Sequence, residues 1–238
     1  MKNKVLLSAL LSSLILLLPL TEYAQSFPPY ENKKGWWVAP IVLTGGALLV
    51  GTENFKHGES QFYGKHFTNF HTGVEDFIQY APNIAYLAAN LKYDKKTIFE
   101  ASKILIAANI FNFVGTKGMK FFSQIERPNK ANYSSFPSGH TSMAFVGAHL
   151  IAKEFGKGDP LISISAYGVA TATGLLRWAN HDHWVSDIVG GAAMGIFATE
   201  LAIRHLPKIM DKLDKNGRLS YEPMLIRDGG GLALTYKF

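Results

Sequence analysis

Side chains that can bind or attack a phosphate are concentrated between Arg177 and Asp187, in the run Arg-Trp-Ala-Asn-His-Asp-His-Trp-Val-Ser-Asp. His183 and Asp187 are spaced i, i+4, so they share one face of any helix that begins near His183. A carboxylate placed there can hold one imidazole nitrogen and leave the other free as a base or a nucleophile. Arg177 can bind two oxygens of an oxyanion through its guanidinium fork.

Two earlier segments have the same chemical character. Lys120 and Arg127 supply two cations, and a proline directly after the arginine stiffens the chain. Residues 136–140 read Phe-Pro-Ser-Gly-His and stand immediately before a helix-like segment. Ser138 can cap that helix, and Gly139 lets the backbone approach a ligand closely. The N–H groups of the helix N-terminus then point at an anion.

Taken singly, each motif is commonplace: a basic loop, a helix start, or a histidine that makes a structural hydrogen bond. Their joint occurrence, each at a helix end, favours one shared oxyanion site. His181 and His183 offer a competing interpretation, a metal site completed by a neighbouring aspartate. Alternate residues converge on one ion mainly in a strand, whereas this stretch joins two helices, so the sequence favours a site without a metal.

Apolar segments on either side of these motifs must position them. The stretches at 53–75 and 115–136 are polar and are predicted to be loops. The last apolar segment contains a run of small residues, Gly190 to Gly195, that permits close helix packing. We expect an all-α protein, a membrane-embedded bundle of about five or six helices after an N-terminal signal segment. The predicted helices are Val38–Gly51, Phe77–Leu91, Thr97–Val114, His140–Phe155, Leu161–Leu176 and Trp184–Leu206.

The two ends of the chain differ from this bundle. Residues 1–26 start with lysines, continue in an apolar run and end in small residues, which is typical of an export signal. An uncleaved anchor helix is the alternative. The basic tail ends in residues that alternate weakly like a strand, and its role is left open. We divide the chain into 1–26 (signal or anchor), 27–76 (short apolar helix and polar loop), 77–206 (helical core) and 207–238 (basic tail).

The amino-acid composition limits the classes of partner that the chain is expected to bind. The chain has 238 residues, 47% of them apolar, and a formal net charge of +6. It contains no cysteine, which excludes a disulfide framework, a thiolate zinc site and a cysteine nucleophile. The positive charge favours anionic partners, and no nucleic-acid-binding motif occurs, so anionic lipid at a membrane is the expected partner. The oligomeric state is not indicated.

The distribution of basic residues predicts the orientation in the membrane. Lysine and arginine gather at 92–96, at 153–159 and after 204, so these parts are predicted to be cytoplasmic. The loops that carry the reactive residues alternate with them and should face the periplasm from the bacterial inner membrane. If the short segment at 38–51 crosses fully, this orientation reverses. A soluble or peripheral periplasmic form is the alternative localisation.

In their order and spacing, the motifs resemble those of the type-2 phosphatidic acid phosphatase superfamily. This group includes lipid phosphatases, bacterial class A acid phosphatases and vanadium haloperoxidases. The resemblance covers about residues 75–205 and rests on three motifs: Lys120-x6-Arg127-Pro128, Pro137-Ser138-Gly139-His140 and Arg177-x5-His183-x3-Asp187. The chain departs from the family pattern at Leu176, where a serine is usual, and we expect an altered phosphate pocket there.

The resemblance implies a role for each residue. His183 would be the nucleophile, Asp187 would orient it, and His140 would be the general acid. No metal or cofactor would be needed, because fixed cations and N–H groups stabilise the transferring phosphoryl group. The implied phosphate-binding residues are Lys120, Arg127, Ser138, Gly139 and Arg177.

The resemblance also implies the reaction, hydrolysis of a lipid phosphate monoester or pyrophosphate through a phosphohistidine. Candidate substrates are a lipid A phosphate, undecaprenyl pyrophosphate, phosphatidylglycerol phosphate and phosphatidate. Three alternatives stay open: a soluble periplasmic acid phosphatase, a vanadate-dependent haloperoxidase, and a non-catalytic protein that binds lipid phosphates. Retention of both histidines and Asp187 disfavours the last.

Overall fold

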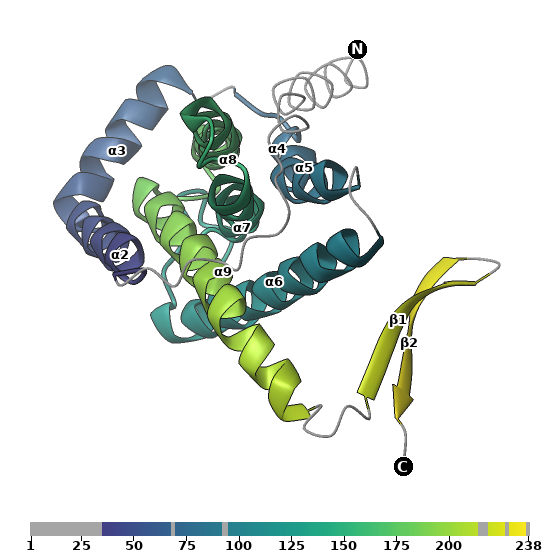
Figure 1. Cartoon of the computed structure of the whole chain (residues 1–238). Coiled ribbons are helices and arrows are strands. Elements are labelled where there is room, and N and C mark those ends of the chain that lie inside the picture. The colour runs from purple at the N-terminus through teal and green to yellow at the C-terminus, as the bar shows by residue number, and fades with distance from the viewer. Residues whose placement is uncertain (1–34, 68–69, 92–94, 214–218, 227–228, 237–238) are drawn as a thin grey trace.

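The computed structural model describes residues 35–67, 70–91, 95–213, 219–226 and 229–236. The predicted signal segment at 1–26 lies outside the described residues. Within them the chain is a helical bundle followed by a two-stranded hairpin, so the predicted helical class is confirmed (Figure 1). The elements are α2 (Val38–Val50), α3 (Glu53–His66), α4 (Glu75–Ile78), α5 (Ala81–Asn90), α6 (Lys95–Ser123), α7 (Gly139–Glu154), α8 (Pro160–Ala179), α9 (Val185–Leu213), β1 (Leu219–Ile226) and β2 (Gly229–Tyr236).

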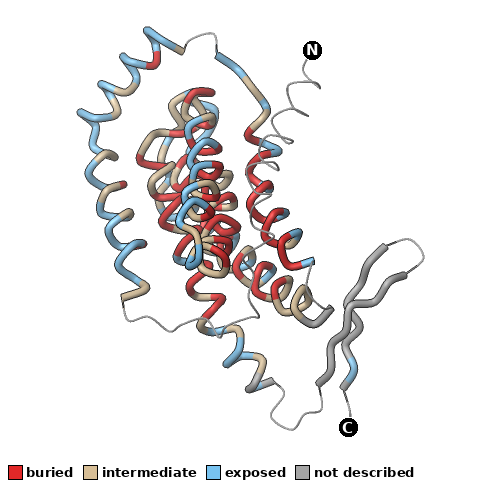
Figure 2. Tube along the Cα trace, turned by 45° about the horizontal axis from the view of Figure 1, so that its top comes forward, coloured by how far each residue is buried: buried red, intermediate tan, exposed pale blue. Residues whose placement is uncertain are grey.

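Helix α7 lies at the centre of the bundle and packs against α5, α6, α8 and α9. Helix α9 also packs against α6 and α2. The core contains large, fully buried side chains, among them Tyr86, Leu150 and Phe155. Figure 2 shows this burial concentrated on the inner helices, whereas α3 is largely exposed. Because α6, α7, α8 and α9 meet in one core, the loops at their ends are held in fixed relative positions.

Glycines bring α9 against the first turns of α7. A Cβ atom at Gly191 would lie 2.6 Å from the carbonyl oxygen of Ser138. At Gly195 it would clash with the carbonyl oxygen of Ser142 and lie 2.8 Å from Cβ of Phe145. The prediction that this small-residue run permits close packing is confirmed.

The prediction of a polar loop at 53–75 is wrong for much of that stretch. Residues 53–66 form α3, which meets α2 at a bend of 74°. Glu53 lies in its first turn, and Lys65 and His66 lie in its last, so these charges complement the helix dipole. A largely exposed helix lacks the strong apolar periodicity from which helices are usually predicted.

Helix α6 is longer than predicted and continues to Ser123, so Lys120 lies on a helix and not in a loop. Gly115, which we expected to end the helix, packs against another helix: a Cβ atom there would lie 2.7 Å from Sδ of Met194. The tail also has more structure than expected, because β1 and β2 pair antiparallel with Leu219 opposite Tyr236.

Two of the described helices are long and apolar enough to cross a membrane, Thr97–Ser123 of α6 and Val185–Met210 of α9. The bent pair of α2 and α3 would add a third if it counts as one span. The most apolar window of α9 is 78% buried inside the protein, against 28% for that of α6. Helix α6 therefore offers more apolar surface to surrounding lipid.

The glycine contacts predict unequal effects of two alanine substitutions. Gly195→Ala should lower the free energy of unfolding by about 1–3 kcal/mol, because the added methyl group forces α7 and α9 apart. Gly168→Ala is the matched control, since a Cβ atom at this exposed position in α8 meets nothing within 4 Å. Thermal unfolding in detergent, followed by circular dichroism, would measure both. Equal midpoints for the two variants would contradict the packing argument.

Candidate active site

His183 and Asp187 form a buried pair where α9 begins. Nδ1 of His183 lies 3.2 Å from Oδ2 of Asp187, and their side chains are 1% and 0% exposed. The same carboxylate oxygen accepts the backbone N–H of Trp184 (2.9 Å) and the hydroxyl of Ser135 (2.5 Å). Because an ionised carboxylate only accepts hydrogen bonds, Nδ1 of His183 is the donor. Its other nitrogen, Nε2, then carries the lone pair.

Burial lowers the pKa of His183 to about 4. The hydrogen bond and the charge of Asp187 oppose this shift, whereas the positive charges of Arg127 and Lys120 add to it. The imidazole is therefore neutral at neutral pH, the protonation state in which Nε2 can attack an electrophile.

Lys120 and Arg127 approach His183 from α6 and from the loop that follows it. The ammonium of Lys120 donates to the carbonyl oxygens of Ser134 (2.5 Å) and Ser135 (2.9 Å). Nη1 of Arg127 donates to the carbonyl oxygen of Asp182 at 3.4 Å. These contacts attach the loop at 124–136 both to α6 and to the segment that precedes α9.

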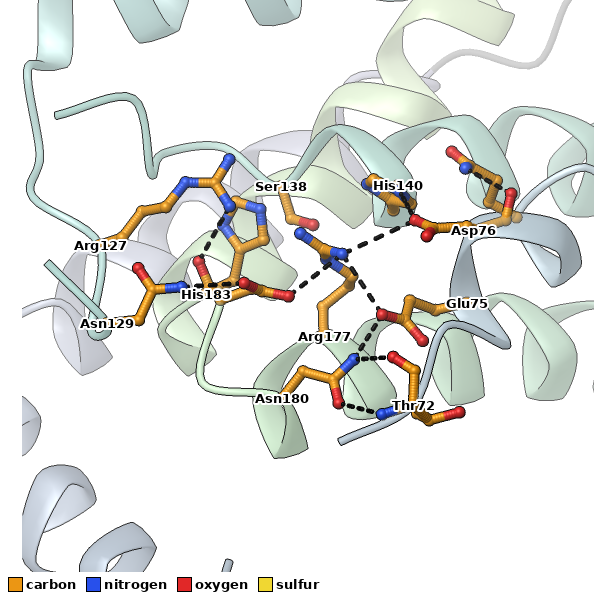
Figure 3. A network of polar contacts seen from close by, with 12 residues as sticks. Thr72, Glu75, Asp76, Arg127, Asn129, Ser138, His140, Arg177, Asn180 and His183 are labelled. Carbon is orange, nitrogen blue, oxygen red and sulfur yellow. Dashed lines mark hydrogen bonds and ion pairs between the residues drawn. The ribbon is translucent and has the colours of Figure 1, made fainter. Parts of the chain in front are cut away.

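Arg177 lies in the last turn of α8, among carboxylates. Its Nη1 lies 3.2 Å from Oδ2 of Asp182, 3.3 Å from Oε1 of Glu75 and 3.9 Å from Oδ1 of Asp76 (Figure 3). Its Nε atom is buried and has no hydrogen-bond partner among the described residues. The guanidinium is thus fixed in direction and keeps an unused donor.

Ser138 caps α7, as predicted. Its Oγ accepts hydrogen bonds from the hydroxyl (2.9 Å) and the backbone N–H (3.4 Å) of Thr141. Its own N–H donates to the carbonyl oxygen of Asp187 at 2.9 Å. Helix α7 begins at Gly139, so the N–H groups of Gly139 and His140 belong to its first turn. Backbone N–H groups in the first turn have no acceptor within the helix and can bind an anion.

His140 lies across the site from Arg127, beyond Arg177 (Figure 3). Its Nε2 is 2.8 Å from Oδ1 of Asp76, which α4 supplies. The structure thus gathers every predicted site residue in one place, including those from loops that are distant in sequence.

Helix α3 supports the segment that carries His183. Glu59 accepts the N–H of Val185 at 3.0 Å, and the ring of Tyr63 stacks on that of His181 with centroids 3.7 Å apart. His181 and His183 therefore have separate partners and do not converge. No group of three or more histidine, aspartate or glutamate side chains among the described residues is arranged to hold a metal ion.

Several residues of this site were not predicted from the sequence: Glu59, Glu75, Asp76, Ser135 and Asn180. Two of them, Glu59 and Glu75, come from the stretch at 53–75 that was expected to be a loop, and Ser135 comes from the one at 115–136. Glu75 lies 102 positions before Arg177, so no local spacing could have linked them. The only available signal was an acidic pair just before an apolar segment, which is typical of a helix N-terminus.

Part of this chain is similar to known proteins. The PAP2 superfamily profile matches residues 112–211. A curated relative, the lipid A 1-phosphatase of Porphyromonas gingivalis, is 30% identical over 196 residues, which are 76% of this chain and 42% of the relative. The chain thus spans less than half the length of that protein.

Two solved structures are similar. The transmembrane PAP2-type phosphatidylglycerolphosphate phosphatase from Bacillus subtilis is 20% identical with a TM-score of 0.51, covering 77% of this chain and 97% of that one. Aquifex aeolicus LpxE is 22% identical with a TM-score of 0.46, covering 60% and 93%. Residues 112–211 are a PAP2 superfamily domain, and the resemblance seen in the motifs is confirmed.

The depressed pKa of His183 predicts how its imidazole titrates. In ¹⁵N-histidine-labelled protein, its ring nitrogens should keep the chemical shifts of a neutral imidazole as the pH falls from 7 to about 5. An exposed histidine would instead titrate near its usual value of about 6.5. Assignment by His183→Gln completes the test, and titration of His183 near pH 6.5 would contradict the burial argument.

Proposed function

We propose that this protein hydrolyses a lipid phosphate, without a metal ion, through a phosphohistidine intermediate on His183. The observation that carries the proposal is the neutral, buried imidazole: Asp187 holds its Nδ1, while Arg127 and Lys120 lie close enough to lower its pKa. A nucleophile among fixed cations is the arrangement that phosphoryl transfer requires, because catalysis depends on positioning and on stabilising charge.

In the first half-reaction, Nε2 of His183 forms a bond to phosphorus as the bond to the leaving oxygen breaks. His140 donates a proton to that oxygen, and Asp187 stabilises the positive charge that develops on His183. Lys120, Arg127 and Arg177 would bind the phosphoryl oxygens together with the N–H of Gly139. Ser138 would shape the same pocket from the helix cap.

In the second half-reaction, His140 accepts a proton from water as the water oxygen attacks phosphorus. The phosphorus–nitrogen bond breaks, His183 returns to its neutral form, and inorganic phosphate leaves. Both histidines end the cycle in their starting protonation states, so the reaction consumes only water and the ester.

A lipid A phosphate is the first substrate to test, because the Porphyromonas gingivalis relative is named for that lipid. The other candidates are undecaprenyl pyrophosphate, phosphatidylglycerol phosphate and phosphatidate. The apolar surface of α6 supports a lipid substrate, since it would hold the site at the membrane. We place the catalytic unit at 77–206 and add the segment at 72–76, which contributes Glu75 and Asp76.

The proposal predicts phosphate release that survives EDTA and disappears in His183→Gln. Loss should be at least about 10³-fold, because removing a nucleophile removes the main reaction path. The assay would use purified protein with the four lipids and a soluble aryl phosphate. His205→Gln is the matched control, at the far end of α9. A base-stable, acid-labile phosphoryl label on the wild type alone would identify the intermediate. Absence of release from every substrate would contradict the proposal.

The second part of the proposal is orientation: the site faces the periplasm from the inner membrane. Its support is the alternation of basic connectors with reactive loops, which lie at opposite ends of α7 and α8. The chain has no cysteine, so single cysteines can report accessibility without background. In cells with a permeabilised outer membrane, an impermeant maleimide should label Ala131→Cys, and it should label Gly158→Cys only after lysis. The reverse pattern would place the site in the cytoplasm.

A further inference from the structure

Helix α4 brings two adjacent carboxylates into the site from outside residues 112–211, which match the PAP2 superfamily profile. The side-chain amide of Asn180 donates to the carbonyl oxygen of Thr72 at 2.9 Å and accepts its N–H at 3.0 Å. The same amide also donates to Glu75, which is only 2% exposed and contacts Arg177. Through these contacts the segment at 72–76 is fixed to the end of α8 (Figure 3). The position of Asp76 is therefore defined by the fold, although its carboxylate is exposed.

Among the described side chains, the exposed carboxylate of Asp76 hydrogen-bonds the ring of His140 and also lies 3.9 Å from Nη1 of Arg177. Oδ1 of Asp76 lies 2.8 Å from Nε2 of His140, and the two side chains are 57% and 27% exposed. No hydrogen bond from a described residue occupies Nδ1 of His140. One ring nitrogen is thus held by a carboxylate, and the other is left for a different partner.

This repeats, on the opposite side of the site, the arrangement of His183 and Asp187. In that pair the carboxylate holds Nδ1, whereas in the pair of His140 and Asp76 it holds Nε2. The first pair is buried, which suits a neutral nucleophile. The second is open to solvent, so a charged ring can be hydrated and can exchange its proton with water.

We propose that Asp76 is the positioning residue of the general acid: it holds Nε2–H of His140 so that Nδ1–H points at the leaving oxygen. The inference rests on the proposed function and adds a residue that the family motifs do not contain. As the phosphorus–oxygen bond breaks, the Nδ1 proton moves to the leaving oxygen and the ring keeps its Nε2 proton on Asp76. In the second half-reaction, Nδ1 takes a proton from the attacking water, which restores the acid.

The charges around His140 determine what loss of Asp76 would do. Three charged groups face its ring: Asp76 from α4, Arg177 from α8, and Asp182 from the loop before α9. Burial and the positive charge of Arg177 lower the pKa of His140, and the two aspartates oppose that shift. Asp76→Asn would therefore lower this pKa further, and at neutral pH less of the ring would carry the proton it must donate.

The way kcat/KM depends on the leaving group distinguishes a positioning role of Asp76 from a purely structural one. Dodecyl phosphate expels a strongly basic alkoxide and needs a general acid, whereas 4-nitrophenyl phosphate expels a weak base and does not. With Asp76→Asn, kcat/KM should fall about 10- to 100-fold for dodecyl phosphate and less than about 3-fold for 4-nitrophenyl phosphate. The alkaline limb of the pH profile should also move to lower pH, because the acid loses its proton earlier.

Asp182→Asn is the matched control. It removes a carboxylate that contacts Arg177 at 3.2 Å, but that carboxylate makes no hydrogen bond to His140. Asp182 acts on the pKa of His140 only through its charge, so the losses for the two esters should differ less than they do with Asp76→Asn. Equal losses for both esters in Asp76→Asn, with an unmoved alkaline limb, would overturn the inference and leave Asp76 as a structural contact. If the wild type releases phosphate from neither these esters nor the lipids, the proposed function itself fails.

Discussion

The carboxylate of Asp187 is the contact on which the site depends. One of its oxygens accepts hydrogen bonds from His183, Trp184 and Ser135, and its backbone carbonyl accepts the N–H of Ser138. One buried residue in the first turn of α9 thus ties together the segment before that helix, the loop after α6 and the cap of α7. An acceptor shared by several donors fixes their mutual geometry, because no donor can move without losing its bond.

Close helix packing makes this connection possible. Gly191 lets α9 approach the carbonyl of Ser138, and Gly195 lets it approach the next turn of α7. A side chain at either position would move the cap away from the carboxylate by a few tenths of an ångström or more. The small residues on one face of α9 therefore determine both the packing of the core and the geometry of the site.

The sequence predicted the parts of the site whose residues are close together in the chain. The spacing of His183 and Asp187 and the capping role of Ser138 depend on local geometry, which a short motif determines. The carboxylates of α4 could not be predicted in this way, because they reach Arg177 and His140 only through the folding of α4 against α8. Helix α3 was missed for a different reason. Its composition is too polar to predict a helix. Its Glu59 accepts the N–H of Val185, a contact between residues far apart in the sequence that no local pattern indicates.

The carboxylates around Arg177 affect how phosphate binds to the site and leaves it. Without substrate, its guanidinium already lies between the carboxylates of Glu75 and Asp182. An arriving phosphate must therefore compete with two resident anions for this cation, and we expect its ground-state binding to be weak. In the proposed reaction the same competition would act on inorganic phosphate, so the resident carboxylates would help to expel the product. An enzyme built in this way would favour turnover over retention of its ligand.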